Sequence, residues 1–298
     1  MIKSLMQLLK FVLLHPLNKK KKLATLMRVI KWQLVSRVFE YPIALPFVNQ
    51  TFLLTTKGME SATANYYCGL QEYEEMSFVI HFLEENDLFI DVGANIGAYS
   101  ILANSCCKNI KTIAFEPIPS TFEFLIKNIR FNNLNIDAKN IGLSDKKGSL
   151  CFTTNLSSCN HVLSKGEKNS SNIDVKVDRL DNILTSQIPQ LIKIDVEGYE
   201  FKVISGMGKI LDNPKLLAII LELNNNGINY GMETHETHKY LLDKGFSSYF
   251  YEPSSKRLIT LNKKFNLNSD NIYIKNLNEV INRLSKEKKN FLNFGQRI

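Results

Sequence analysis

The sequence has few cysteines, and none of them is spaced as a metal or redox pair. Five are present, and even the neighbours Cys106 and Cys107 do not form the C-x-x-C pattern of zinc and redox sites. An odd number without such spacing is most simply explained by reduced thiols. We therefore expect a cytoplasmic protein whose cysteines act neither as metal ligands nor as nucleophiles.

The sequence also lacks an apolar run that could cross a bilayer. Residues 5–14 are mostly apolar, but Lys10 interrupts them and Pro16 ends them, and the run is too short to span. The small-residue cleavage site of a signal peptide is missing as well. Without internal repeats or low-complexity tracts, 298 residues are most economically explained by one large domain with additions at its ends.

Acidic residues are scarce at the two ends of the chain. The net charge is +8, and residues 1–40 carry nine Lys and Arg side chains against one acid, Glu40. Residues 281–298 contribute a further net +4, which leaves residues 41–280 at −4. The charge of the middle of the chain therefore does not indicate the basic track that a nucleic-acid-binding surface needs.

Strand-like and helix-like segments alternate through the middle of the chain. Strands are expected at 88–92, 112–116, 138–142, 191–195 and 216–222, and shorter ones at 249–251, 258–260 and 272–274. Helices are expected near 71–76 and at 98–105, 119–131, 199–211 and 234–244. This order predicts an α/β fold, with a mostly parallel sheet, helices on both faces and an antiparallel edge. The polar stretch 155–172 is expected to form a mobile loop over the site.

A glycine-containing turn follows the first of these strands. Asp91 ends the strand, and Gly93 and Gly97 precede a helix, an arrangement that brings bare backbone against a ligand. The spacing is G-x-x-x-G, which disfavours the dinucleotides bound by G-x-G-x-x-G. Glu116 ends the next strand, 19 residues after Gly97, where it could accept hydrogen bonds from both hydroxyls of a ribose. Alternatively, Glu116 caps the helix that begins near Pro119.

Several motifs occur together in a fixed order, and the chain resembles the FkbM-type family of S-adenosylmethionine-dependent methyltransferases over roughly residues 50–250. The matching segments are 91–97, 115–117, 142–145 with Gly148, 193–200, 205–207 and 221–222. The resemblance implies a Rossmann-like class I methyltransferase fold. It also implies a set of residues that bind S-adenosylmethionine: Asp91, Gly93, Ala94, Asn95 and Gly97 on the methionine side, Glu116 and Pro117 at the ribose, and Ser144 and Asp145 at the adenine. A place for Glu72 on the acceptor side rests on the resemblance alone.

Two charged residues lie in an otherwise apolar strand. Lys193 and Asp195 share a face because side chains alternate along a strand, and burying either one unpaired is costly. One explanation is a structural ion pair. The functional explanation makes Asp195 the base for a hydroxyl acceptor, or a group that orients it, with Lys193 holding it ionised.

Glu222 ends the following strand, and we count it with Lys193 and Asp195 among the catalytic residues. Together with Asn224, the carboxylates of Asp195 and Glu222 could hold Mg²⁺, although we expect no metal. Glu197 is expected to cap a helix that begins at Gly198. His161 is an outside candidate for the base, whereas the pair His235 and His238 is expected on a solvated helix face.

The basic N-terminal segment, residues 1–50, is expected to be helical, with Trp32 among its apolar positions. It could form a collar packed on the core. Alternatively it contacts an anionic membrane peripherally, at the inner face, through residues 1–40. The methyltransferase domain is expected at 51–280, with a basic tail at 281–298.

The predicted function is O-methylation of a hydroxyl on a saccharide, a glycolipid or a related natural product. The acceptor would be a small molecule, a sugar or a glycolipid, and no nucleic acid is expected as a partner. One alternative is a non-catalytic, membrane-associated module that binds S-adenosylmethionine. Another is a nucleic-acid or protein methyltransferase.

Overall fold

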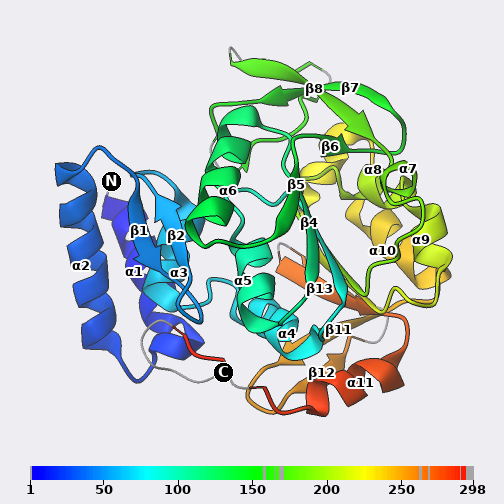
Figure 1. The fold of residues 1–298 in the computed structure, drawn as a ribbon. Coiled ribbons are helices and arrows are strands. Elements are labelled where there is room, and N and C mark those ends of the chain that lie inside the picture. Colours follow the sequence, from blue (N-terminus) through cyan, green and yellow to red (C-terminus); the bar gives the residue numbers. More distant parts are fainter. Residues whose placement is uncertain are drawn as a thin grey trace.

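The computed structural model describes residues 2–156, 159–164, 166–167, 171–261, 264–267, 269–288 and 290–292. An eight-stranded mixed sheet forms its centre, in the order β12-β11-β13-β10-β9-β3-β4-β5 (Figure 1). The strands are β3 (Leu88–Val92), β4 (Lys111–Phe115), β5 (Ile136–Lys139), β9 (Leu191–Ile194), β10 (Ala218–Leu223), β11 (Ser247–Glu252), β12 (Arg257–Thr260) and β13 (Ser269–Ile274).

The neighbouring strands β5, β4, β3, β9 and β10 are parallel, and antiparallel pairing begins at β13. β13 lies antiparallel between β10 and β11, and β12 closes the edge antiparallel to β11. The predicted α/β fold with an antiparallel edge is therefore confirmed. The predicted strand 138–142 differs, because Asn140 turns back to donate to the carbonyl oxygens of Glu116 and Pro117, and the chain leaves the sheet there.

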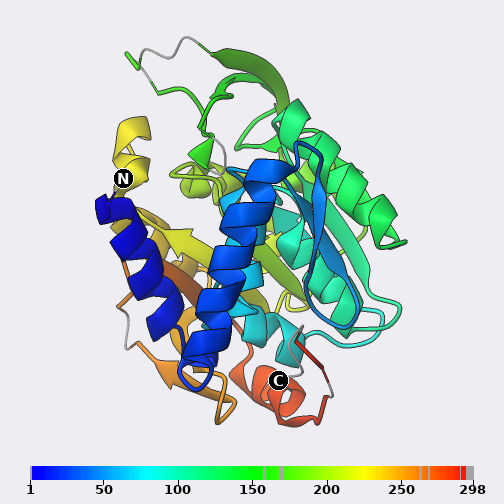
Figure 2. The same ribbon diagram turned by 90° about the vertical axis from the view of Figure 1, so that its left-hand side faces the viewer.

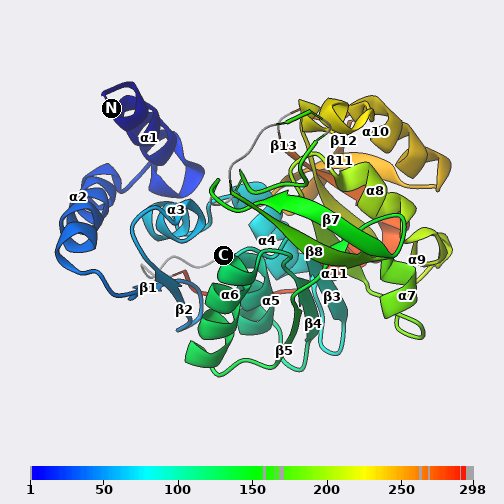
Figure 3. The same cartoon turned by 90° about the horizontal axis from the view of Figure 1, so that it is seen from above.

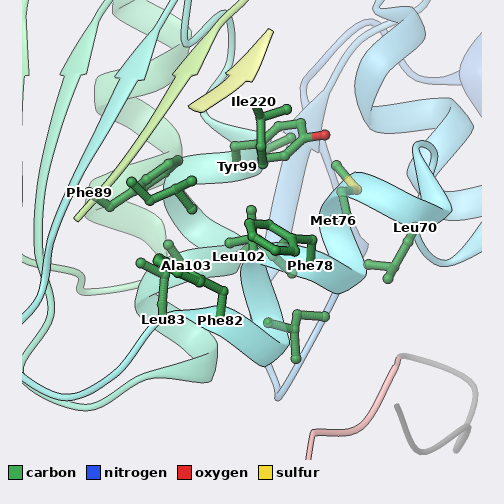
Figure 4. Close-up of a cluster of buried hydrophobic side chains, with 14 of the residues drawn as sticks. Leu70, Met76, Phe78, Phe82, Leu83, Phe89, Tyr99, Leu102, Ala103 and Ile220 are labelled. Atoms are coloured by element: carbon green, nitrogen blue, oxygen red, sulfur yellow. The ribbon is translucent and has the colours of Figure 1, made fainter. Parts of the chain in front are cut away.

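Helices cover both faces of the sheet (Figure 1). One face carries α4 (Tyr73–Phe82), α5 (Ala98–Cys106) and α6 (Pro119–Phe131), and the other carries α7 (Leu180–Ile183), α8 (Glu200–Ser205), α9 (Gly208–Asp212) and α10 (Thr234–Asp243). Alternation along the strands separates the two cores. Phe89 and Ile220 face α4 and α5, as Figure 4 shows, whereas Ile90 and Ile192 face the other way.

A second sheet, in the order β6-β8-β7, lies over one end of the main sheet (Figures 1 and 3). Its strands are β6 (Gly142–Leu143), β7 (Gly148–Thr153) and β8 (Asn172–Asp178). The segment between β7 and β8 contains most of the predicted loop 155–172, part of which lies outside the described residues. The side chains of Phe152 and Asn160 face a cavity at the ends of the parallel strands. The predicted position of this loop over the site is thus supported.

The N-terminal segment packs on the side of this body, as Figure 2 shows. It consists of α1 (Ile2–Leu14), the short helix η1 (Pro16–Asn18), α2 (Lys22–Val38), the hairpin β1 (Ile43–Pro46) and β2 (Phe52–Thr55), and α3 (Glu60–Cys68). Trp32 is 5% exposed and packs with Val29, Tyr66 and Tyr67. That face of α2 is therefore a packed collar, as one of the two interpretations predicted.

The C-terminal segment is also attached to the body. Helix α11 (Leu277–Ser285) buries Val280 and Leu284 against α4, and its Arg283 forms a 2.5 Å ion pair with Asp87 at the start of β3. The divisions after residues 50 and 280 stay predictions, although the β1–β2 hairpin and α11 cross those points. Among the described helices, none is long and apolar enough to cross a membrane.

We predict that the collar contributes to folding stability through Trp32. Trp32→Ala should lower the free energy of unfolding by about 3 kcal/mol, because it removes a large buried side chain. Leu34→Ala, on the exposed face of the same helix, should change it by less than about 0.5 kcal/mol. Denaturant unfolding of both variants measures the difference. Equal losses would mean that α2 does not pack as described.

Candidate active site

The loop between β3 and α5 depends on Gly93. Gly93 has φ +78°, and a Cβ there would lie 1.9 Å from the carbonyl oxygen of Asp195. The amides of Gly93 and Ala94 both donate to the carbonyl oxygen of Phe115, at 3.0 and 2.9 Å. The loop can therefore lie against the ends of both neighbouring strands only with glycine at this position. Gly97 has a different role, because a Cβ there would meet Leu125 of α6 at 2.6 Å.

Glu116 organises the same loop from the end of β4. Its Oε2 accepts from the amide of Asn95 at 2.9 Å, and its Oε1 accepts from the amide of Ile118 at 3.0 Å. Burial raises the pKa of Glu116 to about 7. Asp91 is buried on β3, accepts a 2.6 Å hydrogen bond from Ser100 Oγ, and has its pKa raised by burial. Both capping of the segment before α6 and contact with a ligand are compatible with this position of Glu116.

Lys193 and Asp195 form an ion pair at the end of β9. Their Nζ–Oδ2 distance is 2.9 Å, and the Lys193 side chain is 4% exposed against 33% for Asp195. Burial alone would lower the pKa of Lys193 and raise that of Asp195. The opposite charges outweigh burial, so the pKa of Lys193 is raised and that of Asp195 is lowered. The pair is both a structural ion pair and a source of an ionised carboxylate at the cavity.

Glu222 lies beside Asp195 on the neighbouring strand. Burial and the charge of Asp195 raise the pKa of Glu222 to about 9. Carboxylate oxygens of Asp195, Glu222 and Glu197 lie within 4.8 Å of one another. Glu197 was not predicted in this set, whereas Asn224 is not among the described residues of the cavity wall and its side chain accepts from the amide of Asn226 at 2.9 Å. This set of carboxylates is compatible with a divalent cation but does not require one.

Contrary to the prediction, Glu197 does not cap a helix that begins at Gly198, because α8 begins at Glu200 and its N-cap is Tyr199. Glu197 has φ +55°, and Asn226 Nδ2 donates to its carboxylate at 3.3 Å. Glu200 organises this turn instead, because its Oε1 accepts from the amides of Val196 and Gly198 at 3.3 and 2.9 Å. The predicted helix 199–211 also differs, because it is divided at Gly206 into α8 and α9.

Four residues that sequence reasoning missed, or assigned only by resemblance, surround Lys193. The Lys193 ammonium lies 4.6 Å from the centre of the Tyr99 ring, and the Tyr99 hydroxyl donates to Glu72. Burial raises the pKa of Glu75 to about 8, and it raises that of Asp270 well above its usual range. No local pattern marked either acid, because Glu75 directly follows Glu74 and Asp270 lies between Ser269 and Asn271.

One cavity of about 230 Å³ brings most of the predicted residues together. Its wall contains Asp91, Gly93, Ala94, Asn95, Glu116, Pro117, Lys193, Asp195 and Glu222, together with Glu72, Tyr99 and Glu197. The wall residues from β3, β4 and the loops after them belong to the motifs expected to bind the cofactor. Those from β9 and β10 belong to the group expected to be catalytic. The described wall holds six carboxyl groups and one amine, so carboxyl groups outnumber basic groups there.

Other predicted residues lie away from this wall. Gly97, Ser144 and Asp145 are not among its described lining residues, and Asp145 forms a 2.9 Å ion pair with Lys202. Contact of Ser144 and Asp145 with an adenine stays a prediction. Both ring nitrogens of His161 have partners, Glu167 at 3.0 Å and the carbonyl oxygen of Cys159 at 2.8 Å, and a role for His161 as the base stays a prediction.

The prediction that His235 and His238 lie on a solvated face of α10 is right for His235 and wrong for His238. His235 is exposed and pairs with Glu233, but His238 is buried and bonds the hydroxyl of Tyr273 at 2.7 Å. The burial of His238 follows from the position of α10 against β13, which a single helix pattern does not reveal.

Comparison with known proteins identifies the family. Residues 91–248, more than half of the chain, match the model of the methyltransferase FkbM domain. The chain therefore belongs to this family of methyltransferases, and the methyl donor that the family implies is S-adenosylmethionine.

Two relatives match part of this chain. A hexuronic acid methyltransferase, AglP of Haloferax volcanii, is 28% identical over 149 residues, which cover 50% of this chain and 61% of that protein. Methyltransferase sdnD of Sordaria araneosa is 29% identical over 161 residues, covering 42% of this chain and 62% of that protein. The chain thus spans about three fifths of the length of these relatives.

Solved methyltransferase structures resemble the chain more loosely. A precorrin-6y C5,15-methyltransferase from Geobacter metallireducens has a TM-score of 0.40 at 14% identity, over 74% of this chain and 94% of that one. A Pyrococcus abyssi tRNA (uracil-54, C5)-methyltransferase has a TM-score of 0.43 at 11% identity, over 79% of this chain and 44% of that one.

We predict that Gly93→Ala abolishes cofactor binding. The added methyl group would clash with the Asp195 carbonyl and force a strained φ, so the loop must move. Gly148→Ala on β7 is the matched control, because no atom lies within 4 Å of its added Cβ. Calorimetric titration with S-adenosylhomocysteine measures both variants. Binding retained by Gly93→Ala would remove this loop from the cofactor site.

Proposed function

We propose that the enzyme methylates a hydroxyl group of a saccharide, with Asp195 as the general base. The observation that carries this proposal is an ionised carboxylate, held by buried Lys193, on the wall of a cavity that also contains the glycine loop. A hydroxyl is a poor nucleophile until its proton is removed, so a positioned base accelerates its methylation.

The residues at the ends of β3 and β4 suit S-adenosylmethionine. When bound, this cofactor supplies an electrophilic methyl group on a sulfonium sulfur. Gly93 leaves bare backbone at the cavity, and Asp91 and Glu116 add acceptors for hydrogen bonds. We assign Asp91, Ala94 and Asn95 to the methionine side and Glu116 with Pro117 to the ribose.

Asp195 and Glu222 differ in proton affinity although they are neighbours. Lys193 lowers the pKa of Asp195, whereas burial and Asp195 itself raise that of Glu222 to about 9. At neutral pH, Asp195 is therefore ionised and can accept the hydroxyl proton, while Glu222 keeps its own proton and can donate a hydrogen bond. Two carboxyl groups whose environments separate their pKa values in this way are typical of acid–base sites.

The charge of the cavity supports a neutral acceptor. The described wall has six carboxyl groups, of which Asp195 is ionised and Glu222 keeps its proton, and its one amine, Lys193, is already paired with Asp195. A sugar hydroxyl can donate to an ionised carboxylate and accept from a protonated one, but an acceptor's carboxylate or phosphate would meet the charge of Asp195 without an unpaired cation on the described wall. We therefore propose an uncharged sugar, in contrast to the hexuronic acid named for the relative in Haloferax volcanii.

The same charge argues against other acceptors. Nucleic acids are polyanions, and their binding requires neutralising Lys or Arg side chains. Among the described wall residues only Lys193 is basic, and it is already paired with Asp195. A glycolipid with a neutral sugar meets the requirement of the cavity equally well. It would also explain a membrane contact by residues 1–40, which remains part of the proposal.

We predict that Asp195→Asn lowers kcat by about 10²- to 10⁴-fold, the usual contribution of a general base. Binding of S-adenosylhomocysteine should largely survive, because the shape of the side chain is kept. Asp137→Asn is the matched control, because Asp137 forms a surface ion pair with Lys139 on the same sheet. Stopped assays with a labelled methyl donor measure kcat. A parallel loss of rate and cofactor affinity would assign Asp195 to the cofactor instead.

The variant Lys193→Met tests, in the same assay, whether Lys193 controls the ionisation of Asp195 and does not act only through folding. Without the ammonium the pKa of Asp195 rises, so the acid limb of the pH–rate profile should move to higher pH. An unmoved limb in a folded variant would remove Asp195 from the role of base.

Chelation with EDTA tests the alternative in which Asp195, Glu197 and Glu222 hold Mg²⁺, and we expect activity to be unchanged.

We predict that neutral sugars are preferred over hexuronic acids. For matched glycosides that differ only in a hydroxymethyl or carboxylate group, kcat/KM should be at least about tenfold higher for the neutral one. Glu197→Gln should narrow this preference, because it removes a charge from the wall without touching the Lys193–Asp195 pair. Equal or faster turnover of the hexuronic acid would contradict the proposed acceptor.

A further inference from the structure

Helix α2 presents an apolar stripe to solvent on the side opposite its packed face. The stripe consists of Leu23, Met27, Ile30, Leu34 and Val38, which are spaced by three or four residues and are 52–75% exposed. At about 100° per residue these five positions share one face of the helix. The face toward the body is formed by other positions, among them Val29 and Trp32.

Cations surround the apolar stripe. By the helical rotation, Lys31 lies beyond one edge of it and Arg37 beyond the other, and both are exposed. The four lysines 19–22 are exposed at its N-terminal end. Helix α2 itself contains no acidic residue. An apolar stripe with basic edges is the pattern of a helix that lies in the plane of a membrane interface.

We propose that the apolar stripe of α2 docks on an anionic lipid surface. The positive charge around the stripe decides which partner binds it, a second copy of the chain or a lipid surface. A second copy would bring two segments of net +8 together, which is unfavourable, whereas anionic lipid offers both apolar depth and negative charge. The helix is about 25 Å long and bears cations along its length, so it would lie on the surface. This inference does not depend on the identity of the acceptor.

Co-sedimentation of the full chain with vesicles tests the proposal. The chain should bind phosphatidylcholine vesicles that contain about 30% phosphatidylserine, bind pure phosphatidylcholine weakly, and be released by added salt. Replacing lysines 19–22 with glutamine should weaken binding at least about tenfold, since each lysine near the surface contributes about fivefold.

A matched pair of isoleucines tests the apolar part. Ile30 on α2 and Ile281 on α11 are 52% and 50% exposed, and both lie on helices. Ile30→Gln should weaken vesicle binding severalfold, and the double variant Leu23→Gln/Leu34→Gln should weaken it further. Ile281→Gln should bind as the unmodified chain does. Equal binding by the Ile30 and Ile281 variants would overturn the proposal.

Further outcomes separate the other occupants and the catalytic proposal. Concentration-dependent dimers in sedimentation velocity that the Ile30 variant abolishes, without vesicle binding, would assign the stripe to a second copy. A lipid-induced blue shift of Trp32 emission would contradict docking by the outer face, because Trp32 is buried on the other side. The vesicle assay contains neither acceptor nor cofactor, so loss of catalysis cannot imitate loss of docking.

Discussion

The ion pair between Lys193 and Asp195 is the interaction on which the arrangement of the site depends. Taking an ammonium group out of water costs several kcal/mol unless opposite charges and hydrogen bonds replace the solvent. Lys193 is 4% exposed and has Asp195 at 2.9 Å and the Tyr99 ring at 4.6 Å. Because the acids around it outweigh burial, its pKa is raised and it stays charged. That charge in turn permits several carboxyl groups to be packed close together.

The register of the sheet explains how these groups meet. On the face toward α4 and α5, Phe89, Leu191, Ile220 and Ile272 are apolar core residues. Two positions further along each strand toward the carboxyl edge, the same faces carry charged residues. Asp91 lies opposite Lys193, and Glu222 lies opposite Asp270 two residues nearer the edge, because Lys193 lies opposite Ile220. A continuous apolar layer therefore gives way to a charged band across four strands. The apolar layer excludes water from below, which strengthens the interactions within the band.

Much of this arrangement could be predicted because it follows from local patterns. The alternation of strands and helices, the glycine turn after Asp91 and the shared face of Lys193 and Asp195 each depend on a few neighbouring residues. The rest depends on contacts between distant segments. Asp270 joins the band only because β13 inserts antiparallel beside β10, and Glu197 joins Asp195 and Glu222 because the chain turns at Glu197, which has φ +55°. The sheet of β6, β7 and β8 was missed for the same reason.

The N-terminal helices show the same limit and connect the two proposals. Periodicity in α2 predicted a helix but could not distinguish its packed face from its exposed one, since both carry apolar residues. Helices α1 and α2 pack on α3, which contributes Ser61 to the cavity wall, and Gln71 and Glu72 follow α3 closely. A surface bound by α2 would therefore lie near the acceptor side. An anionic surface attracts residues 1–40, which carry net +8, whereas residues 41–298 carry no net charge, so the enzyme would be oriented with α2 toward the lipid. An acceptor anchored by a lipid and ending in an uncharged sugar suits both surfaces, because it resides at the membrane and brings no negative charge into the cavity.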